Sequence, residues 1–388
     1  MKMSDVNVAS VLFGTQAQVG VNRGLAEFHA GRPVLIAGTG ETLLTLPVEA
    51  LDARRLAAFV ALCAPAAPRL VITARRACSL GLDAGGPVAL NIAAGLDVKT
   101  ILALVADAKF DGAVVAEPAG PAAIAAVELV KLAQVLPAVL VADAAPAKAA
   151  AFNPPLVSVE AAAVTRFRAD VIRSLAISGE AQMPLNSGVR TRFVVFRDAI
   201  GGSQVAVIAG NPDFSKPVPV RLHSACLTGD VFGSRRCDCG DQLKLALTRL
   251  TAEGGGVILY LAQEGRGLGL TNKMRTYQLQ DAGLDTVDAN TTLGFDDDER
   301  DYGIAARMLE ILGCNRVILL TNNPTKLDGL VEAGIEVTGR MSIETPSNSD
   351  NRRYLTAKAA RAGHQLDHLM ASLAEPAEAE RIVAQLTS

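Results

Sequence analysis

The chain has 388 residues, of which 50% are hydrophobic, and a formal net charge of −3. This length is most simply two domains, and the hydrophobic content suffices for a sizeable core in each. The slightly acidic charge gives no support for nucleic-acid binding through bulk electrostatics, so an anionic ligand must meet a local cluster of basic residues, and a small molecule is the expected partner.

The hydropathy pattern indicates neither a targeting segment nor a membrane span. Residues 1–14 contain too short an apolar run for a signal peptide, and no stretch reaches the roughly eighteen uninterrupted apolar residues of a membrane helix. We therefore expect a soluble, cytoplasmic protein with no membrane partner. In that reducing compartment, Cys63, Cys78 and Cys314 are expected to be buried small hydrophobes rather than disulfide partners.

The first part of the chain, from about residue 20 to 150, is rich in Ala, Val and Leu. Its apolar runs predict buried strands and the stretches between them predict helices, which is the pattern of an α/β layer structure. The predicted strands are residues 33–36, 70–73 and 138–142, and the predicted helices are residues 53–63 and 122–134.

A domain boundary is predicted between the two halves. Residues 144–155 are small and proline-rich, and the helix-like run after them ends near Gly179. We expect one domain at residues 1–175 and a second at residues 176–388. The fold class is α/β (α+β), with a β-rich start to the second domain.

The second half is denser in Gly, Asp, Arg, Thr and Asn, the residues of loops and polar sites. Two of its buried strands are each followed by a polar turn and a helix, which is where α/β proteins place ligands. The predicted strands are residues 192–196, 205–208, 218–222, 257–261 and 317–320, and a helix at residues 241–253 precedes a glycine stop signal.

Three of the six cysteines, Cys226, Cys237 and Cys239, fall within fourteen residues. Three thiolate ligands with an open fourth position are typical of a catalytic zinc site, and the spacing is not that of a zinc ribbon. The alternative is three unligated thiols near a turn, although Asp238 beside two of them favours an exposed loop over an apolar core. His223 is a candidate fourth ligand.

Two polar turns are candidate phosphate sites. Residues 264–269 supply glycines and Arg266, but the glycine spacing matches no nucleotide fingerprint, so a turn with an exposed arginine is the alternative. Residues 321–326 gather a hydroxyl, amides and Lys326 where a helix begins at Pro324, and there the alternative is an Asn-rich cap.

An acidic run at residues 296–301 surrounds one arginine. Such runs are usually solvated surface. Asp298 and Arg300, next to Tyr302, are also compatible with a proton acceptor and a charge clamp in one loop, and spacing does not choose between these interpretations.

Taken together, six motifs in the correct order resemble GTP cyclohydrolase II over roughly residues 180 to 370. They are residues 221–230, 237–242, 263–266, 285–290, 293–300 and 320–324. The resemblance implies a hydrolase acting on C–N bonds, which converts GTP to 2,5-diamino-6-(5-phospho-D-ribosylamino)pyrimidin-4(3H)-one, formate and pyrophosphate. This reaction is the first step of riboflavin biosynthesis.

The resemblance also implies roles for individual residues. Cys226, Cys237 and Cys239 would hold Zn²⁺, which would activate water for attack on the guanine ring. Tyr277 would assist ring opening and Asp298 would accept a proton. Arg300 matches a nucleophile toward the α-phosphate, but a protonated guanidinium is better suited to stabilising the departing pyrophosphate. GTP, carrying Mg²⁺, would be bound by Arg221, Leu222, His223, Ser224, Ala225, Gln242, Glu264, Gly265, Arg266, Thr286, Thr321 and Lys326.

One departure from the family pattern is Ala225, which stands where the family has a Glu beside the first thiol. If that Glu binds guanine or orients water, the substrate or product differs, for example by stopping at a formamidopyrimidine. If its contact is through the backbone, the alanine is harmless. A non-catalytic nucleotide-binding relative is a further alternative.

The first half has a fainter resemblance to the 3,4-dihydroxy-2-butanone 4-phosphate synthase domain. Residues 30–36, 95–104 and 122–143 follow its frame, but residues 38–43 and 118–123 lack its acidic magnesium loop and its histidine. Without these groups the same chemistry is not available. We expect a degenerate domain that has lost synthase activity and serves stability or dimerisation, and the resemblance implies a homodimer.

Overall fold

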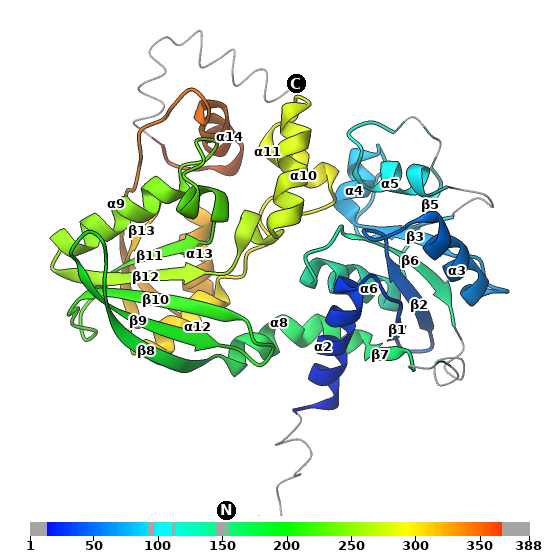
Figure 1. Cartoon of the computed structure of the whole chain (residues 1–388), viewed down its shortest axis with the longest axis horizontal. Helices are drawn as coiled ribbons and strands as arrows, with labels where there is room; N and C mark the ends of the chain where they lie inside the picture. Colours follow the sequence, from blue (N-terminus) through cyan, green and yellow to red (C-terminus); the bar gives the residue numbers. More distant parts are fainter. Residues whose placement is uncertain are drawn as a thin grey trace, which may run out of the picture. The chain divides into compact units, whose positions relative to one another are not determined.

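The computed structural model describes residues 14–91, 97–110, 112, 114–144, 152 and 155–366 (Figure 1). Most of the predicted linker at 144–155, and the tail beyond residue 370, lie outside these residues. Packing divides the chain into two units. The first unit comprises residues 1–170, 268–284 and 288–298, and the second comprises residues 171–267, 285–287 and 299–388.

The first unit is built on a mixed sheet of seven strands in the order β5-β4-β3-β6-β2-β1-β7. Neighbouring strands are antiparallel except β1 and β7, which are parallel. The strands are β1 Val34–Ala37, β2 Thr42–Pro47, β3 Arg69–Ile72, β4 Val88–Asn91, β5 Ala116–Pro118, β6 Ala138–Asp143 and β7 Val157–Glu160.

Several helices of the first unit begin after a side chain that caps them. Asp52, Thr73 and Asp97 each accept a hydrogen bond from a backbone N–H of the first turn of the helix that follows, satisfying a donor that the helix leaves unpaired. The helices that this unit draws from the first half of the chain are α2 Gln16–His29, α3 Ala53–Cys63, α4 Ala74–Ser79, α5 Val98–Ala106, α6 Pro121–Leu132 and α8 Ala161–Ser174, and the last four residues of α8 belong to the second unit.

The second unit is built on another mixed sheet of seven strands, in the order β14-β13-β11-β12-β10-β9-β8. Strands β8 to β10 and β12 pair antiparallel, whereas β12, β11, β13 and β14 run parallel. The strands are β8 Ala176–Pro184, β9 Arg190–Arg197, β10 Ser203–Gly210, β11 Val218–Ser224, β12 Gly255–Leu261, β13 Arg316–Leu320 and β14 Glu336–Met341.

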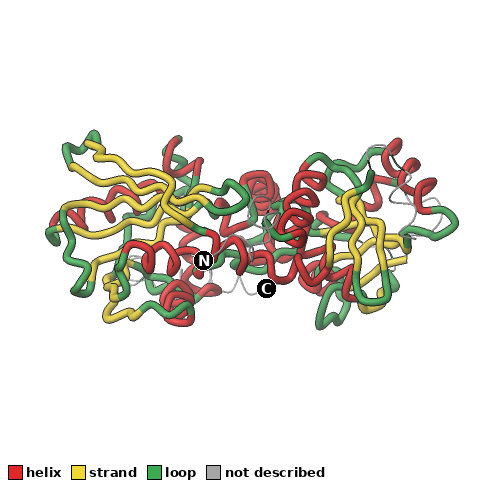
Figure 2. The backbone as a smooth tube through the Cα atoms, turned by 90° about the horizontal axis from the view of Figure 1, so that it is seen from below, coloured by secondary structure: helices red, strands yellow, loops and turns green. Residues whose placement is uncertain are grey.

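Helices cover both faces of this second sheet, and Figure 2 shows strands and helices in adjoining layers within each unit. Along β12, Val257 and Leu259 pack in one core with α12 (Gly303–Leu312) and α13 (Pro324–Glu332). Ile258, pointing to the opposite face, packs with α9 (Cys239–Ala252). The run is mostly apolar because a strand covered on both faces buries nearly all of its side chains, with Tyr260 partly buried.

Most predicted elements occur within a few residues of their expected bounds, and the helix at 53–63 coincides with α3. The predicted end of one helix was wrong. The helix before the second unit ends at Ser174, and Gly179 lies inside strand β8. The small and polar residues around Gly179 were mistaken for a helix end because β8 is exposed along its whole length and so lacks the apolar alternation of a half-buried strand.

The least expected feature of the fold is that residues 268–284 and 288–298 belong to the first unit, although they come late in the sequence. They carry α10 (Leu270–Asp281) and most of α11 (Thr286–Thr292). Leu293 and Phe295, each 1% exposed, are part of the same core cluster as strands β3 and β6. Burying each such side chain contributes about 1.5–3 kcal/mol, so these two residues contribute substantially to holding the segment in the first unit.

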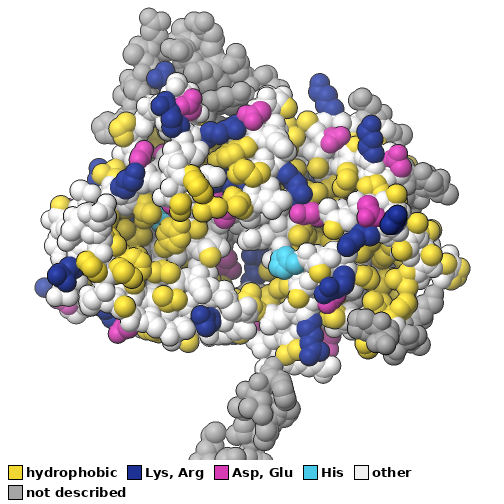
Figure 3. All heavy atoms as spheres, viewed as in Figure 1, with side chains coloured by type: hydrophobic (Ala, Val, Ile, Leu, Met, Phe, Trp, Pro, Cys, Tyr) yellow, Lys and Arg dark blue, Asp and Glu magenta, His cyan; other side chains and the backbone are white. Residues whose placement is uncertain are grey.

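On the face drawn in Figure 3, basic and acidic side chains are interspersed, in keeping with the small net charge. Among the residues that the structure describes, no helix is both long and apolar enough to cross a membrane.

Candidate functional site

The carboxyl ends of three parallel strands place the predicted polar turns at one edge of the second sheet. Strands β11 and β12 pair in register through Ser224 and Leu261, their last residues, and β13 flanks β11 on its other side. The thiol-bearing segment follows β11, residues 264–267 follow β12, and residues 321–326 follow β13. Ligands of open α/β sheets bind at this kind of edge.

The three thiols converge at this edge. Cys226 precedes a π-helical turn, Leu227–Val231, Cys237 follows it, and Cys239 is the first residue of α9. Their sulfur atoms all lie within 4.8 Å of one another, and the Sγ atoms of Cys226 and Cys237 are 3.7 Å apart. Tetrahedral zinc with Zn–S bonds of about 2.3 Å separates its sulfur ligands by about 3.8 Å. The donor set and its spacing therefore fit zinc.

Two glycines allow the thiols to come together. A Cβ on Gly229 would lie 2.8 Å from the Sγ of Cys237, closer than side chains tolerate, and 3.2 Å from that of Cys226, which is a tight contact. A Cβ on Gly240 would lie 2.3 Å from the carbonyl oxygen of Gly229, because α9 begins directly against the π-helical turn. Because Gly229 has no side chain, the Sγ atoms of Cys226 and Cys237 pack directly against its backbone.

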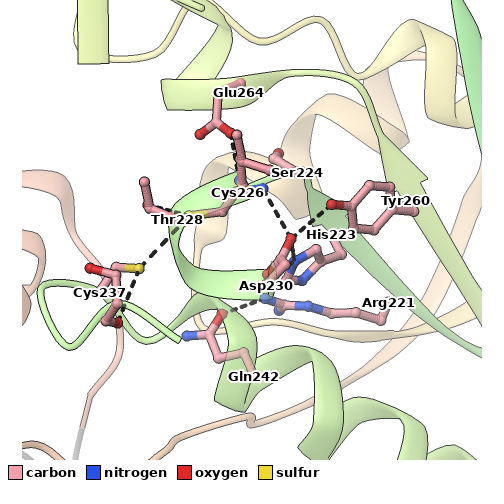
Figure 4. Close-up of polar contacts among 12 residues, drawn as sticks. Arg221, His223, Ser224, Cys226, Thr228, Asp230, Cys237, Gln242, Tyr260 and Glu264 are labelled. Carbon is pink, nitrogen blue, oxygen red and sulfur yellow. Dashed lines mark hydrogen bonds and ion pairs between the residues drawn. The ribbon is translucent and has the colours of Figure 1, made fainter. Parts of the chain in front are cut away.

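Asp230 fixes this turn to the strands beneath it (Figure 4). Its carboxylate accepts hydrogen bonds from the backbone N–H of Cys226 at 3.0 Å and from the hydroxyl of Tyr260 at 2.9 Å. The Nε2 atom of His223 lies 3.1 Å from both carboxylate oxygens. Sequence reasoning did not assign a role to Asp230, although it closes the motif at 221–230, because its partners lie on two different strands.

His223 is buried at 2% exposure and stacks on the ring of Tyr260, with 5.5 Å between centroids. Burial lowers the pKa of His223 and outweighs the opposing effect of Asp230, so the imidazole is neutral at pH 7. Among the described residues, the group able to hold a metal consists of the three cysteines, and His223 is not part of it. Its Nδ1 atom is buried and has no hydrogen-bond partner among the residues that the structure describes.

A chain of buried polar groups runs behind the thiols. Arg221 donates from Nη1 to the carbonyl of Leu320 at 2.9 Å and from Nη2 to Oε1 of Gln242 at 2.6 Å. Gln242 donates to Asp238, which also pairs with Lys358 at 3.2 Å. Burial lowers the pKa of Arg221 to about 10, which leaves the guanidinium charged at pH 7. Its Nε atom is buried without a partner in the described structure.

The turn after β12 is a short 3₁₀ segment, Glu264–Gly267, with two residues in the left-handed region. Arg266 is one of them, with φ 60° and ψ 32°. A non-glycine residue in this region has a strained backbone, and such strain occurs most often at functional sites. Glu264 accepts a hydrogen bond from the N–H of Leu227 at 2.7 Å, and the carbonyl of Arg266 accepts one from Glu299. The turn is therefore tied to the thiol-bearing segment.

The turn after β13 is a capped helix start. Thr321 accepts a hydrogen bond from the N–H of Asn323, whose side chain in turn accepts from Thr325 at the beginning of α13. Lys326 is buried and donates from Nζ to the carbonyl of Leu222 at 2.7 Å. The Asn-rich cap is therefore present, and the anion-binding role of this turn stays a prediction.

Ala225 makes its interstrand contact through the backbone, where its N–H donates to the carbonyl of Leu261 at 2.8 Å. This contact does not depend on the side chain, so the substitution leaves the local path of the chain supported. Beside it, the Oγ of Ser224 lies 3.4 Å from Nη1 of Arg300, whose guanidinium is 5.6 Å from the ring centroid of Tyr302.

The remaining predicted site residues are divided between the units. Tyr277 on α10 and Asp298 belong to the first unit, whereas Thr286 at the start of α11 belongs to the second, as does Arg300. The Nζ atom of Lys273 lies 5.8 Å from the ring centroid of Tyr277. Their roles stay predictions.

The other three cysteines do not share one environment. Cys63 and Cys314 are buried, as expected, and burial raises the pKa of Cys314 to about 11. The expectation for Cys78 was wrong, because this side chain is exposed. Its helix, α4, spans six residues and turns Arg76 and Ala77 inward instead.

In the first unit, the two degenerate motifs at 38–43 and 118–123 meet. The Oε1 atom of Glu41 accepts a hydrogen bond from the N–H of Ala122, at 2.7 Å, in the first turn of α6. A carboxylate at a helix start satisfies a free donor and complements the helix dipole. Glu41, the acidic residue of its motif, is thus used as a helix cap.

The sequence model of a family described as GTP cyclohydrolase II matches residues 176–342. A protein named GTP cyclohydrolase-2 from Azospirillum brasilense is 42% identical over 360 residues, which cover 89% of this chain and 93% of that protein. A GTP cyclohydrolase-2 from Azotobacter vinelandii is 50% identical over 50% of this chain and 94% of its own length. A riboflavin biosynthesis protein RibBA from Bacillus mycoides is 53% identical over 42% of this chain and 41% of its own.

Proposed function

Because this chain belongs to the GTP cyclohydrolase II family and is an enzyme of that type, we propose that it holds zinc on Cys226, Cys237 and Cys239 and hydrolyses GTP. The proposed products are 2,5-diamino-6-(5-phospho-D-ribosylamino)pyrimidin-4(3H)-one, formate and pyrophosphate, as the first step of riboflavin biosynthesis. The observation that carries the proposal is the cluster of three sulfurs within 4.8 Å, packed over a glycine at the carboxyl edge of parallel strands.

Bound zinc would supply Lewis acidity and a lowered pKa of water for attack on C8 of guanine. The protein's part is to hold three thiolates at one point. Asp230 accepts the N–H of Cys226 and so fixes the backbone of the first ligand. The buried pair of Asp238 and Lys358 fixes the chain between the other two ligands, because Asp238 lies between Cys237 and Cys239.

GTP would lie along the same edge of the sheet, with Mg²⁺ on its triphosphate. The basic groups there are Arg221, Arg266, Arg300 and Lys326, and a local cluster of this kind is what an acidic chain needs in order to bind an anion. The further contacts that we propose are the ones that the family resemblance implies, from Leu222, His223, Ser224, Ala225, Gln242, Glu264, Gly265, Thr286 and Thr321.

We assign proton handling to Tyr277 and Asp298, by hydrogen bonding or proton transfer during ring opening and by proton acceptance, respectively. Arg300 would stabilise the charge that develops on the departing pyrophosphate. A guanidinium is protonated at any ordinary pH, so electrostatic stabilisation is a simpler role for Arg300 than nucleophilic attack.

Formate release tests the proposal. The zinc-loaded protein incubated with GTP should produce formate and pyrophosphate, and a chelator should abolish both. Cys237→Ser should lose zinc and ring opening together, because two remaining thiolates no longer form the site. Cys78→Ser is the matched control, since Cys78 is an exposed thiol outside the cluster. Absence of formate from the zinc-loaded wild type would refute the function.

Because Ala225 stands where the family has a Glu, the product must be identified as well as its rate of release measured. A relative with altered chemistry would stop at a formamidopyrimidine and retain the formyl group. The backbone bond from Ala225 to Leu261 favours the complete reaction, because the segment keeps its path without the carboxylate. Mass spectrometry of the nucleotide product distinguishes the two outcomes by the mass of CO, by which a formamide exceeds the free amine.

For the first unit we propose no synthase chemistry of its own. Glu41, which stands in the degenerate acidic motif, is engaged at the start of α6. The homodimer that the resemblance implies stays a prediction.

A further inference from the structure

The first unit contains a piece of sequence that the family motifs assign to catalysis. We call residues 268–284 and 288–298 the inserted segment, because they lie within the first unit although they come from the second half of the chain. The inserted segment carries Tyr277 and ends at Asp298. The contacts that hold it therefore bear on the position of both residues.

Thr73, the N-cap of α4, holds the inserted segment from one side. Its hydroxyl donates to the carbonyl of Gly294 at 2.6 Å and accepts from the N–H of Arg76. Gly294 has a φ of +89°, and a Cβ there would lie 2.9 Å from the Thr73 hydroxyl. The close approach is thus possible only with glycine at this point of the segment.

Arg76 holds the same stretch from within the core. It is 1% exposed and donates from Nη1 to the carbonyl of Thr292 at 2.9 Å. Its other nitrogens donate to the carbonyls of Leu104 and Ala103 at 2.7 and 2.9 Å. A buried guanidinium that makes this many directed bonds has little freedom to move, and it joins α4, α5 and the inserted segment at one point.

Further contacts hold the inserted segment near Asp298 and along the helix that carries Tyr277. Asp296, two residues before Asp298, pairs with Arg75 at 2.7 Å and with Lys131 at 3.5 Å. On α10, Asn272 donates to the carbonyl of Gln134 at 2.9 Å. The helix that carries Tyr277 is therefore fixed to the first unit as well.

We propose that Thr73 and Arg76 are positioning residues for the loop that ends at Asp298, and so for the part that Asp298 takes in GTP hydrolysis. This inference rests on the proposed function, since it assumes the role of Asp298 in GTP hydrolysis. The part of the first unit before residue 171 thereby gains a role, although none of the proposed catalytic residues lies in it. Misplacement of a reacting group by about 1 Å can cost about a hundredfold in rate.

The test compares two buried threonines of the first unit in the full-length, zinc-loaded enzyme. Thr73→Val removes the donor to Gly294, whereas Thr45→Val removes an equivalent buried donor to the carbonyl of Val34, between β1 and β2. We expect Thr73→Val to lower kcat by about ten- to a hundredfold with little change in KM or zinc content. Thr45→Val should leave kcat unchanged, and Thr73→Ser, which keeps the hydroxyl, should restore it.

Equal kcat values for Thr73→Val, Thr45→Val and wild type would overturn the inference while leaving GTP hydrolysis intact. If the wild type releases no formate, the proposed function fails first and the inference fails with it. Should Thr73→Val not fold, Arg75→Ala removes the exposed pair with Asp296, and Arg32→Ala removes a comparable exposed pair with Glu27. A fall in kcat of up to about fivefold confined to Arg75→Ala supports the inference, and its absence opposes it.

Discussion

At the scale of single residues, the candidate metal site is defined as much by its glycine and its aspartate as by its thiols. Cys226, Cys237 and Cys239 were identifiable from the sequence because soft ligands so close together have few other uses. Gly229 and Asp230 lie between them in the sequence, yet their importance follows from contacts. Gly229 leaves room for the sulfurs, and Asp230 bonds the backbone of Cys226.

Gly229→Ala should abolish zinc binding. The added methyl group would lie 2.8 Å from the Sγ of Cys237 and 3.2 Å from that of Cys226, so the thiols must separate. We expect a loss of bound zinc, measured by metal analysis of the purified protein, and a parallel loss of formate release.

The matched control is Gly179→Ala. Gly179 lies in the exposed strand β8, and a Cβ there would have no neighbour within 4 Å. Its zinc content should equal that of the wild type. A Gly229→Ala protein that keeps its full complement of zinc would show that the turn adapts, and would contradict the steric interpretation.

At the scale of elements, α14 (Arg352–Ala362) is joined to the beginning of α9 by one buried ion pair. Lys358 and Asp238 are 12% and 4% exposed at their side chains, and Lys358 also lies 4.3 Å from the ring centroid of Tyr354. Burial would raise the pKa of Asp238, but Lys358 and other donors hold it below its usual value. The carboxylate is therefore charged and depends on its partner.

Lys358→Met should destabilise the second unit by about 3–5 kcal/mol, because it leaves Asp238 buried and uncompensated. Denaturant unfolding followed by circular dichroism measures this change in the free energy of unfolding. The double variant Asp238→Asn with Lys358→Met should recover part of the loss, since no charge then remains unpaired.

Lys244→Met provides the comparison for an exposed pair near the start of the same helix. Lys244 and Asp241 are 79% and 69% exposed at their side chains, so its loss should change stability by less than about 1 kcal/mol. Equal effects of Lys358→Met and Lys244→Met would mean that the buried pair does not fasten α14 to α9.

At the scale of the whole molecule, the six cysteines differ in exposure, so the number of thiols that react with a labelling reagent tests which of them hold the metal. Cys78 is exposed, Cys63 and Cys314 are buried, and the remaining three form the cluster. The thiolate is the reactive form, and burial raises the pKa of Cys314 to about 11, so this residue is a protonated thiol at pH 8.

A thiol-reactive chromophore at pH 8 should therefore label one cysteine rapidly in the zinc-loaded native protein. After chelation the count should rise toward four, but more slowly than Cys78 reacts, because Cys226 and Cys237 are buried and hydrogen bonds to Cys226 raise the pKa of Cys237 and Cys239. The count should reach six only in denaturant. Cys78→Ser should remove the rapid reaction of the zinc-loaded protein. Rapid labelling of several thiols before chelation would contradict the assignment of the cluster as a metal site.

The sequence by itself determined most of the elements, the family and the three thiols that form the cluster. Apolar runs marked the parallel strands, polar turns marked their carboxyl ends, and the six ordered motifs identified the family, because all of these signals are local in the chain. The strand β8 was missed because an exposed strand lacks the hydrophobic alternation from which strands are recognised.

Only the tertiary structure decided which distant residues support one another. Thr73 bonds Gly294 across 221 positions of sequence, and Glu41 caps α6 across 81. Neither contact leaves a local signature, because burial and hydrogen bonding depend on which surfaces the folded chain brings together. For the same reason, the allocation of residues 268–284 and 288–298 to the first unit was visible only in the packed core that contains Leu293 and Phe295.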